Sequence, residues 1–106
     1  MPKFLIQASY TADGARGLLK EGASGRSRAA KEAVSSAGGK VESQYWALGD
    51  VDTFMIIDMP DTVTAAGLSL AVSASGAVHL STTRLLTVEE LDAACKTTVK
   101  YRPPGE

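Results

Sequence analysis

The stretch KVESQYWALGDVDTFMIID, residues 40–58, decides the fold because it holds two β-type segments joined by a short turn. Residues 40–48 and 52–58 are rich in β-branched and aromatic side chains, and residues 49–51 between them are Gly, Asp and Val. Glycine and aspartate favour the backbone angles of tight turns. The stretch therefore predicts an antiparallel hairpin.

The turn also carries two carboxylates, Asp50 and Asp52, which could serve acid–base chemistry or hold a metal ion. Carboxylates at the tip of a turn are solvated, whereas catalytic groups usually have a tuned environment. We therefore interpret both residues as part of the turn.

Upstream of the hairpin, residues 3–10 form a predicted strand that ends at Thr11, a good helix N-cap. Apolar residues then recur at helical spacing from 11 to 37, although glycines at 22–25 indicate a break or bend. The glycine pair 38–39 ends this helix.

Downstream of the hairpin, Asp61 or Thr62 begins a second helix that ends at Gly76. Residues 77–86 are a fourth predicted strand, and the sequence TVEE at 87–90 is a capping box that starts a short helix to about Lys96. The paired prolines after it favour an extended tail.

The predicted order is therefore β-α-β-β-α-β with an extra C-terminal helix, in one domain spanning 1–106, of which 96–106 is a partly extended tail. The common compact arrangement of this order is an α+β, ferredoxin-like antiparallel sheet with helices on one face.

The composition narrows the possible partners. Eleven basic and twelve acidic residues give a net charge of -1, which favours neither nucleic acid nor an acidic membrane surface. The single cysteine, Cys95, has no disulfide partner in the chain, and the N-terminal apolar run is too short for a signal peptide. We expect a cytoplasmic protein, and we interpret Cys95 as a small residue that faces apolar neighbours.

Alternation along the strands predicts two faces of the sheet. If the turn is centred on residues 50–51, Trp46 faces Met55 across the hairpin. The helix-covered core is then predicted to contain Phe4, Ile6, Ala8, Tyr45, Ala47, Phe54, Ile56, Val78 and Leu80. The other face is predicted to carry Leu5, Gln7, Ser9, Glu42, Gln44, Trp46, Leu48, Met55, Ile57, His79, Ser81 and Thr83.

A face this apolar would leave a large exposed patch on a monomer. We therefore expect a homo-oligomer, a dimer or higher, in which two sheets face each other as an α+β barrel with a partly polar lumen. The residues predicted to bind a small molecule there are Gln7, Gln44, Trp46, Met55, His79, Ser81 and Thr83.

His79, the only histidine, is the best candidate for a general acid or base, although a lone histidine is more often structural. A weaker anion site is predicted at the start of the second helical segment, from Ser24, Arg26 and Arg28. No second histidine or CxxC pair accompanies His79, so we expect no metal and no cofactor.

Several blocks of the sequence together resemble the GYD-domain family, small bacterial proteins named for a Gly-Tyr-Asp signature and grouped with dimeric α+β barrel proteins. The blocks are FLIQASYT (4–11), GLLKEG (17–22), GDVD (49–52) after an aromatic pair, LSLAVSASGAV (68–78), LLTVEELDAA (85–94) and YRPPG (101–105). The signature tyrosine is replaced by Val51 here, while Gly49 and Asp52 are retained. The resemblance implies a fold and an oligomer, but no particular activity.

Three functions remain open at this stage. The first is an oligomeric protein that binds a small metabolite in the lumen. The second is a cofactor-independent isomerase or oxygenase that uses His79, by analogy with other α+β barrel families. The third is a purely structural interaction module with a collapsed lumen.

Overall fold

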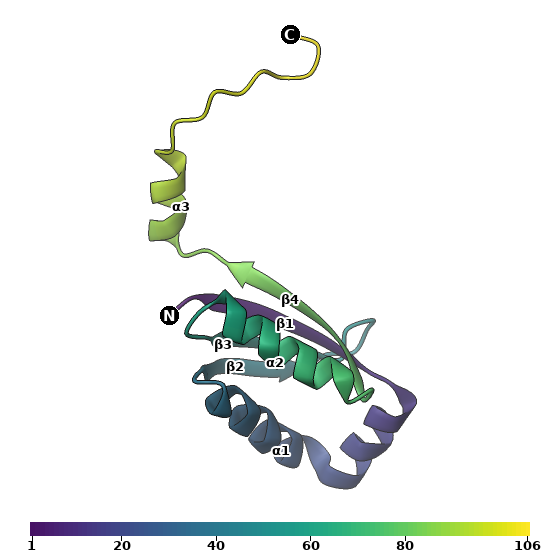
Figure 1. Cartoon of the computed structure of the whole chain (residues 1–106). Coiled ribbons are helices and arrows are strands. Elements are labelled where there is room, and N and C mark those ends of the chain that lie inside the picture. Colours follow the sequence, from purple (N-terminus) through teal and green to yellow (C-terminus); the bar gives the residue numbers. More distant parts are fainter.

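The computed structural model describes all residues from 1 to 106 and contains every predicted strand and helix, with ends within two residues of those expected (Figure 1). The elements are β1 (Lys3–Tyr10), α1 (Ala12–Ser36), β2 (Lys40–Trp46), β3 (Thr53–Asp58), α2 (Thr62–Ala74), β4 (Val78–Leu85) and α3 (Val88–Cys95).

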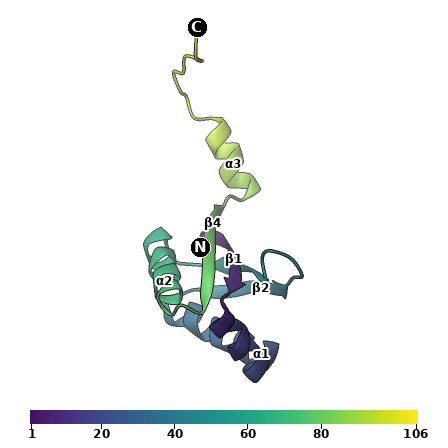
Figure 2. The same cartoon turned by 90° about the vertical axis from the view of Figure 1, so that its right-hand side faces the viewer.

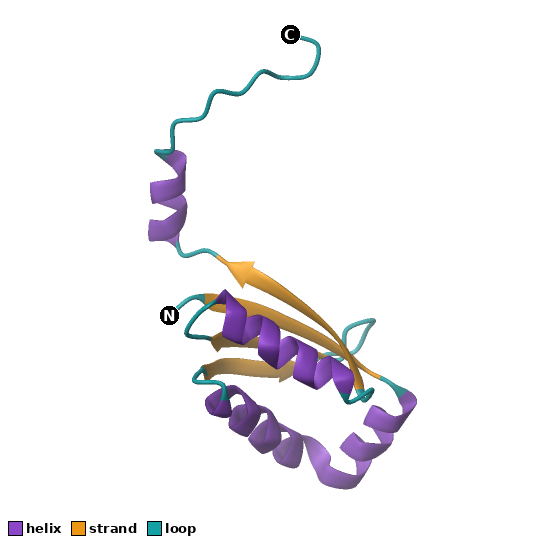
Figure 3. Ribbon diagram, viewed as in Figure 1, coloured by secondary structure: helices purple, strands orange, loops and turns teal.

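The four strands form one antiparallel sheet in the order β2-β3-β1-β4. Helices α1 and α2 lie on the same face of this sheet (Figure 3). This is the ferredoxin-like α+β arrangement that the order of elements predicted. We call the face under the helices the covered face and the opposite one the open face.

Local signals fix the ends of the helices as predicted. The side chain of Thr11 caps α1, and the Asp61 carboxylate accepts a hydrogen bond of 2.7 Å from the Thr64 amide at the start of α2. That bond holds the pKa of Asp61 below its ordinary value. Thr87 and Glu90 form the predicted capping box at α3.

Two glycines shape α1. Gly22, with φ of 79°, interrupts the helix and bends it at the predicted break, and Gly38, with φ of 86°, ends it. Only glycine adopts such positive φ angles without steric cost. The bend turns the second half of α1 onto the sheet, beside α2 (Figure 1).

The core lies between the covered face and the two helices. Its buried members come from β1, β3 and both helices, together with the residue after β3: Phe4, Ile6, Val34, Ile57, Met59 and Ala65. Ile57 and Met59 are 0% exposed. The core therefore depends on β3 and on the residue that directly follows it.

The predicted faces of the hairpin were wrong. In the β1–β3 ladder Phe4 pairs with Ile57 and Ile6 pairs with Met55, so the covered face carries Met55 and Ile57. Gln44 pairs with Met55, and Trp46 pairs with Thr53, which places Gln44 and Trp46 on the covered face too. The residues that were expected in the core but lie on the open face are Tyr45, Phe54 and Ile56.

The physical reason is that residues 54–57 are apolar at every position, so alternation alone cannot choose a face. Asp58 settles the choice, because its carboxylate accepts a hydrogen bond of 2.9 Å from Lys3 Nζ at the end of the open face. Met59 extends the buried set, and its amide donates to the carbonyl of Pro2 at 3.0 Å.

The hairpin loop is longer than predicted. It spans 47–52 and is closed by the Ala47 amide, which donates to the Asp52 carbonyl at 2.8 Å. Leu48 is fully exposed in this loop and does not pair with Thr53. A bulge between Val41 and Ser43 adds one residue to β2, which lets Val41 pack against the core.

By contrast, the assignment of β1 and β4 to the two faces is confirmed. Gln7 pairs with Ser81 and Ser9 pairs with His79 on the open face. Beyond β4, α3 and the tail extend away from the sheet (Figure 2). No helix has both the length and the apolar character needed to cross a membrane.

Candidate functional site

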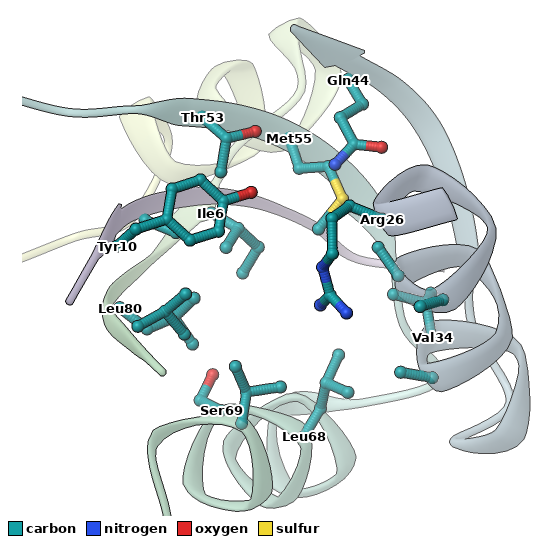
Figure 4. A pocket seen from close by; sticks show the side chains of 16 residues that line it. Ile6, Tyr10, Arg26, Val34, Gln44, Thr53, Met55, Leu68, Ser69 and Leu80 are labelled. Carbon is teal, nitrogen blue, oxygen red and sulfur yellow. The ribbon is translucent and has the colours of Figure 1, made fainter. Parts of the chain in front are cut away.

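A cavity of about 120 Å³ lies between the covered face and helices α1 and α2 (Figure 4). Twelve of its sixteen lining residues are hydrophobic, so it favours an apolar molecule. The apolar walls include Ile6, Ala8, Met55 and Leu80 from the sheet, Ala30, Ala33 and Val34 from α1, and Leu68 and Val72 from α2. Since an apolar cavity of roughly 150 Å³ holds benzene in another protein, this one suits a small ring or a short branched chain.

Gln44 contributes an unsatisfied polar atom to the cavity wall. It lies on β2 opposite Met55, and its Oε1 is buried without a hydrogen-bond partner in the chain. An unsatisfied buried acceptor costs about 1–3 kcal/mol. A donor group on a bound molecule would remove that cost.

Arg26 supplies the positive charge of the site. Its side chain extends from α1 into the cavity, on the side where Met55 and Leu68 also lie (Figure 4). Its only ion pair is with Glu21, 3.4 Å from Nη1 to Oε2, and its side chain is 39% exposed. Exposed pairs of this kind contribute little, so the guanidinium is free to bind a carboxylate on a ligand instead.

The bend at Gly22 explains why Arg26 reaches the cavity. A new helical segment starts after it, and Arg26 stands near the N-terminal end of that segment. The positive end of the helix dipole adds to the charge of the guanidinium there. The predicted neighbours Ser24 and Arg28 are exposed and do not line the cavity.

A hydrogen-bonded cluster connects the hairpin loop to the cavity. Tyr10 lines the cavity, and its hydroxyl accepts a bond of 3.2 Å from Trp46 Nε1. The Tyr10 amide donates to Asp52 Oδ2 at 2.8 Å, while the Ser9 hydroxyl donates to the carbonyl of Asp50 at 2.6 Å. The Asp52 carboxylate thus fastens the loop to the end of β1, which supports the interpretation of these aspartates as turn residues.

The structure divides the predicted ligand-binding residues between the two faces. Gln44 and Met55 line the cavity, and Trp46 adjoins it through Tyr10. The remaining four predicted residues, Gln7, His79, Ser81 and Thr83, lie on the open face. The predicted set is therefore not one site within a single chain, because the assignment of the hairpin to the open face was wrong.

His79 is exposed on β4, and its side chain forms no hydrogen bond within the chain. Cys95 is exposed on α3, so its predicted apolar surroundings within the chain are absent. No three side chains of His, Cys, Asp or Glu gather at any point of the chain.

The open face has an apolar centre and a charged end. Its apolar side chains are Leu5, Tyr45, Phe54 and Ile56. At its end, Lys3 Nζ bonds to Asp58 at 2.9 Å and to Glu42 at 3.2 Å, and the bond to Asp58 is the main cause of the raised pKa of Lys3.

Sequence reasoning missed Tyr10 and the wall formed by α2. Tyr10 continues the alternation of Ile6 and Ala8, so its place on the covered face could have been predicted. Leu68 and Val72 were hidden because α2 is apolar on both sides, which leaves no clear inward stripe in the sequence.

The fold and the cavity define a ferredoxin-like α+β domain with a small internal apolar site. Residues 4–95 match the family model described as the GYD domain. The match covers most of the chain, and the chain therefore belongs to the GYD domain family. No curated protein and no solved structure matches it.

Proposed function

We propose that this GYD domain binds a small organic acid in the cavity under α1 and α2. In this proposal Arg26 pairs with the carboxylate of the ligand, and Gln44 accepts a hydrogen bond from a donor group on the same ligand. The observation that carries it is the buried, unpartnered Oε1 of Gln44 in a mostly apolar wall.

The shape and charge of the site support this ligand class. The apolar walls favour a compact hydrocarbon body. The guanidinium favours a carboxylate because its planar N–H groups match the two oxygens. Buried polar groups discriminate strongly against molecules that leave them unpaired, so a ligand with a hydroxyl or amine donor is preferred.

Calorimetric titration with 4-hydroxybenzoate, benzoate and phenol tests the proposal, because the last two probes each lack one polar group of the first. We expect 4-hydroxybenzoate to bind at least tenfold more tightly than either. Arg26→Met should reduce the affinity for the two carboxylates at least tenfold and leave phenol unchanged. The matched control is Arg28→Met, two residues away on the exposed side of α1.

Equal affinities for the three probes would contradict the proposal, as would an equal effect of Arg26→Met and Arg28→Met. Absence of binding by all three to a folded chain would also count against an aromatic acid of this size. His79→Ala serves as a further control, since His79 lies on the other face of the sheet and should not affect binding.

We also propose that the open face pairs with a second copy of the chain. Leu5, Phe54 and Ile56 form an apolar strip on an uncovered sheet, which soluble proteins generally cover. Two such sheets face to face would enclose Gln7, His79 and Ser81 between them, as in the predicted barrel. A catalytic role for His79 would require this assembly, because a single chain gives it no enclosed surroundings.

Light scattering during size exclusion tests the pairing. Ile56→Asp should convert the assembly to an 11.0 kDa monomer, because it would bury an unpaired charge. Leu48→Asp is the matched control, since Leu48 is equally apolar but stands in the hairpin loop. A wild-type chain that is monomeric at micromolar concentration would contradict this proposal.

A further inference from the structure

Helix α3 has an apolar side with no partner in its own chain. Every residue of α3 except Glu90 is exposed. Val88, Leu91 and Cys95 recur at helical spacing, so they share one side of the helix. Helices of eight residues are marginal in water without packing, so α3 needs a surface to dock on.

The corner between β4 and α3 directs the helix away from its own domain. Arg84 Nη2 donates to Glu90 Oε2 at 2.8 Å, and the Thr87 amide donates to Glu90 Oε1 at 2.9 Å. These bonds fix the start of α3, which stands clear of α1 and α2 in both views (Figures 1 and 2). In this arrangement α3 cannot pack on the helices of its own chain.

Helix α2 also has an apolar outer side that nothing in the chain covers. It contains no charged residue, and its exposed outer positions include Val63, Gly67, Leu70 and Ala74. Leu70 is 71% exposed. Apolar side chains on an uncharged helix are normally covered by protein.

A surface groove beside this outer side matches α3 in length. Small side chains form much of the groove, which has a volume of about 490 Å³. It is lined by Ala33 and Ser36 of α1, by Ala37 directly after α1, and by Thr64, Gly67, Leu68, Ala71 and Val72 of α2. Small residues allow a helix to approach closely. The nine residues from 64 to 72 and the eight of α3 both span about 12 Å.

We infer that α3 docks in the groove between α1 and α2 of a second copy of this chain, with Val88, Leu91 and Cys95 against the partner's groove. Each chain has one such helix and one such groove, so a reciprocal exchange about a two-fold axis buries the apolar side of α3 and fills the groove in both chains. This contact involves the helix layer and is independent of the ligand cavity and of any pairing of the open sheet faces.

The single cysteine provides a direct test, because Cys95 lies on the docking side of α3. A chain with Gly67→Cys and Cys95→Ser is mixed with a tagged wild-type chain and oxidised mildly. A Cβ atom at position 67 meets no atom within 4 Å, so there is room for the substitution. We expect a disulfide between the new thiol and Cys95 of the other chain, seen as a product of distinct mobility on non-reducing gels.

Gly17→Cys with Cys95→Ser is the matched control, since a side chain at this α1 position also meets open space. Its linked product should be at least tenfold less abundant, and Leu91→Asp in the tagged chain should lower the Gly67→Cys product to the same level. Ala71→Cys repeats the test should Gly67→Cys fail to fold.

Equal linkage at Gly17→Cys and Gly67→Cys would overturn the inference, because it would indicate random collision. No linkage from folded Gly67→Cys and Ala71→Cys chains would overturn it too. A third contrary result is a disulfide within one chain when Gly67→Cys is combined with native Cys95, which would mean that α3 folds back on its own groove.

Discussion

The two faces of the sheet contrast in how they are covered, although the hairpin supplies each with apolar side chains. On the covered face, Met55 and Ile57 pack beneath two helices, and Met55 lines the cavity. On the open face, Phe54 and Ile56 have no covering layer in the chain. The residues at the end of β3 therefore decide which face is buried. Met59 continues the buried side chains of the covered face, whereas the charged Asp58 ends the apolar side chains of the open face.

The largest expected effect compares neighbouring isoleucines on the two faces. Ile57→Ala should lower the free energy of unfolding by about 2–5 kcal/mol, because Ile57 is fully buried. Ile56→Ala should cost less than half as much in dilute protein. Urea denaturation measures both, and an equal loss at the two positions would remove the contrast between the faces.

The next effect concerns the polar residue of the cavity wall. Gln44→Met should raise the free energy of unfolding by about 1 kcal/mol, because it removes a buried acceptor without a partner. The same change should abolish any preference for ligands that carry a donor. Gln7→Met on the open face should leave stability within about 0.5 kcal/mol of the wild type. A loss of stability for Gln44→Met would mean that its carboxamide is satisfied.

A smaller effect on stability is expected in the hairpin loop, which joins β2 to β3. Asp52→Ala should cost about 1–2 kcal/mol, because the Tyr10 amide loses its charged acceptor. Asp50→Asn should be neutral, since Asp50 engages Ser9 only through its backbone carbonyl. Thermal unfolding of the two variants measures this difference. Equal losses would indicate that the Asp50 carboxylate has a role of its own.

The smallest expected effect is the pH dependence of α3, the helix that lies apart from both faces of the sheet. The pKa of Glu90 is lowered, first by the Thr87 amide and then by Arg84. Its contribution to α3 is therefore complete above the ordinary glutamate pKa, about 4.3, and is lost as the pH falls through the lowered value in the folded protein. Circular dichroism should show a small loss of helix on acidification that Glu90→Gln does not show. An identical acid response in both chains would assign the change to other carboxylates.

The fold could be predicted because its signals are local. Thr11, Asp61 and the capping box at Thr87 mark helix starts in the sequence, and Gly22 and Gly38 mark the bend and the end of α1. Each of these effects depends on a few consecutive residues. For that reason the order of the elements was predicted correctly, and their ends lie within two residues of those predicted.

The candidate site could be predicted only in part, because it depends on contacts between distant segments. Arg26 was identified from the start of a helical segment, but its position beside Gln44 depends on the angle of the bend at Gly22. Gln44 and Met55 were identified as ligand-binding residues on the wrong face, since the strand 54–57 is apolar throughout. The ion pair between Lys3 and Asp58, 55 residues apart, decides that face.

The bulge in β2 also affects how the sheet can grow. Strands β2 and β4 are its two edges, and an exposed edge can recruit a strand from another molecule. On β2 the bulge at Glu42, together with Lys40 beside it, interrupts the regular row of backbone groups and adds charge. On β4 the register is continuous from Val78 to Leu85. The bulge and the lysine therefore discourage aggregation by strand addition at β2, whereas β4 has no bulge to do so.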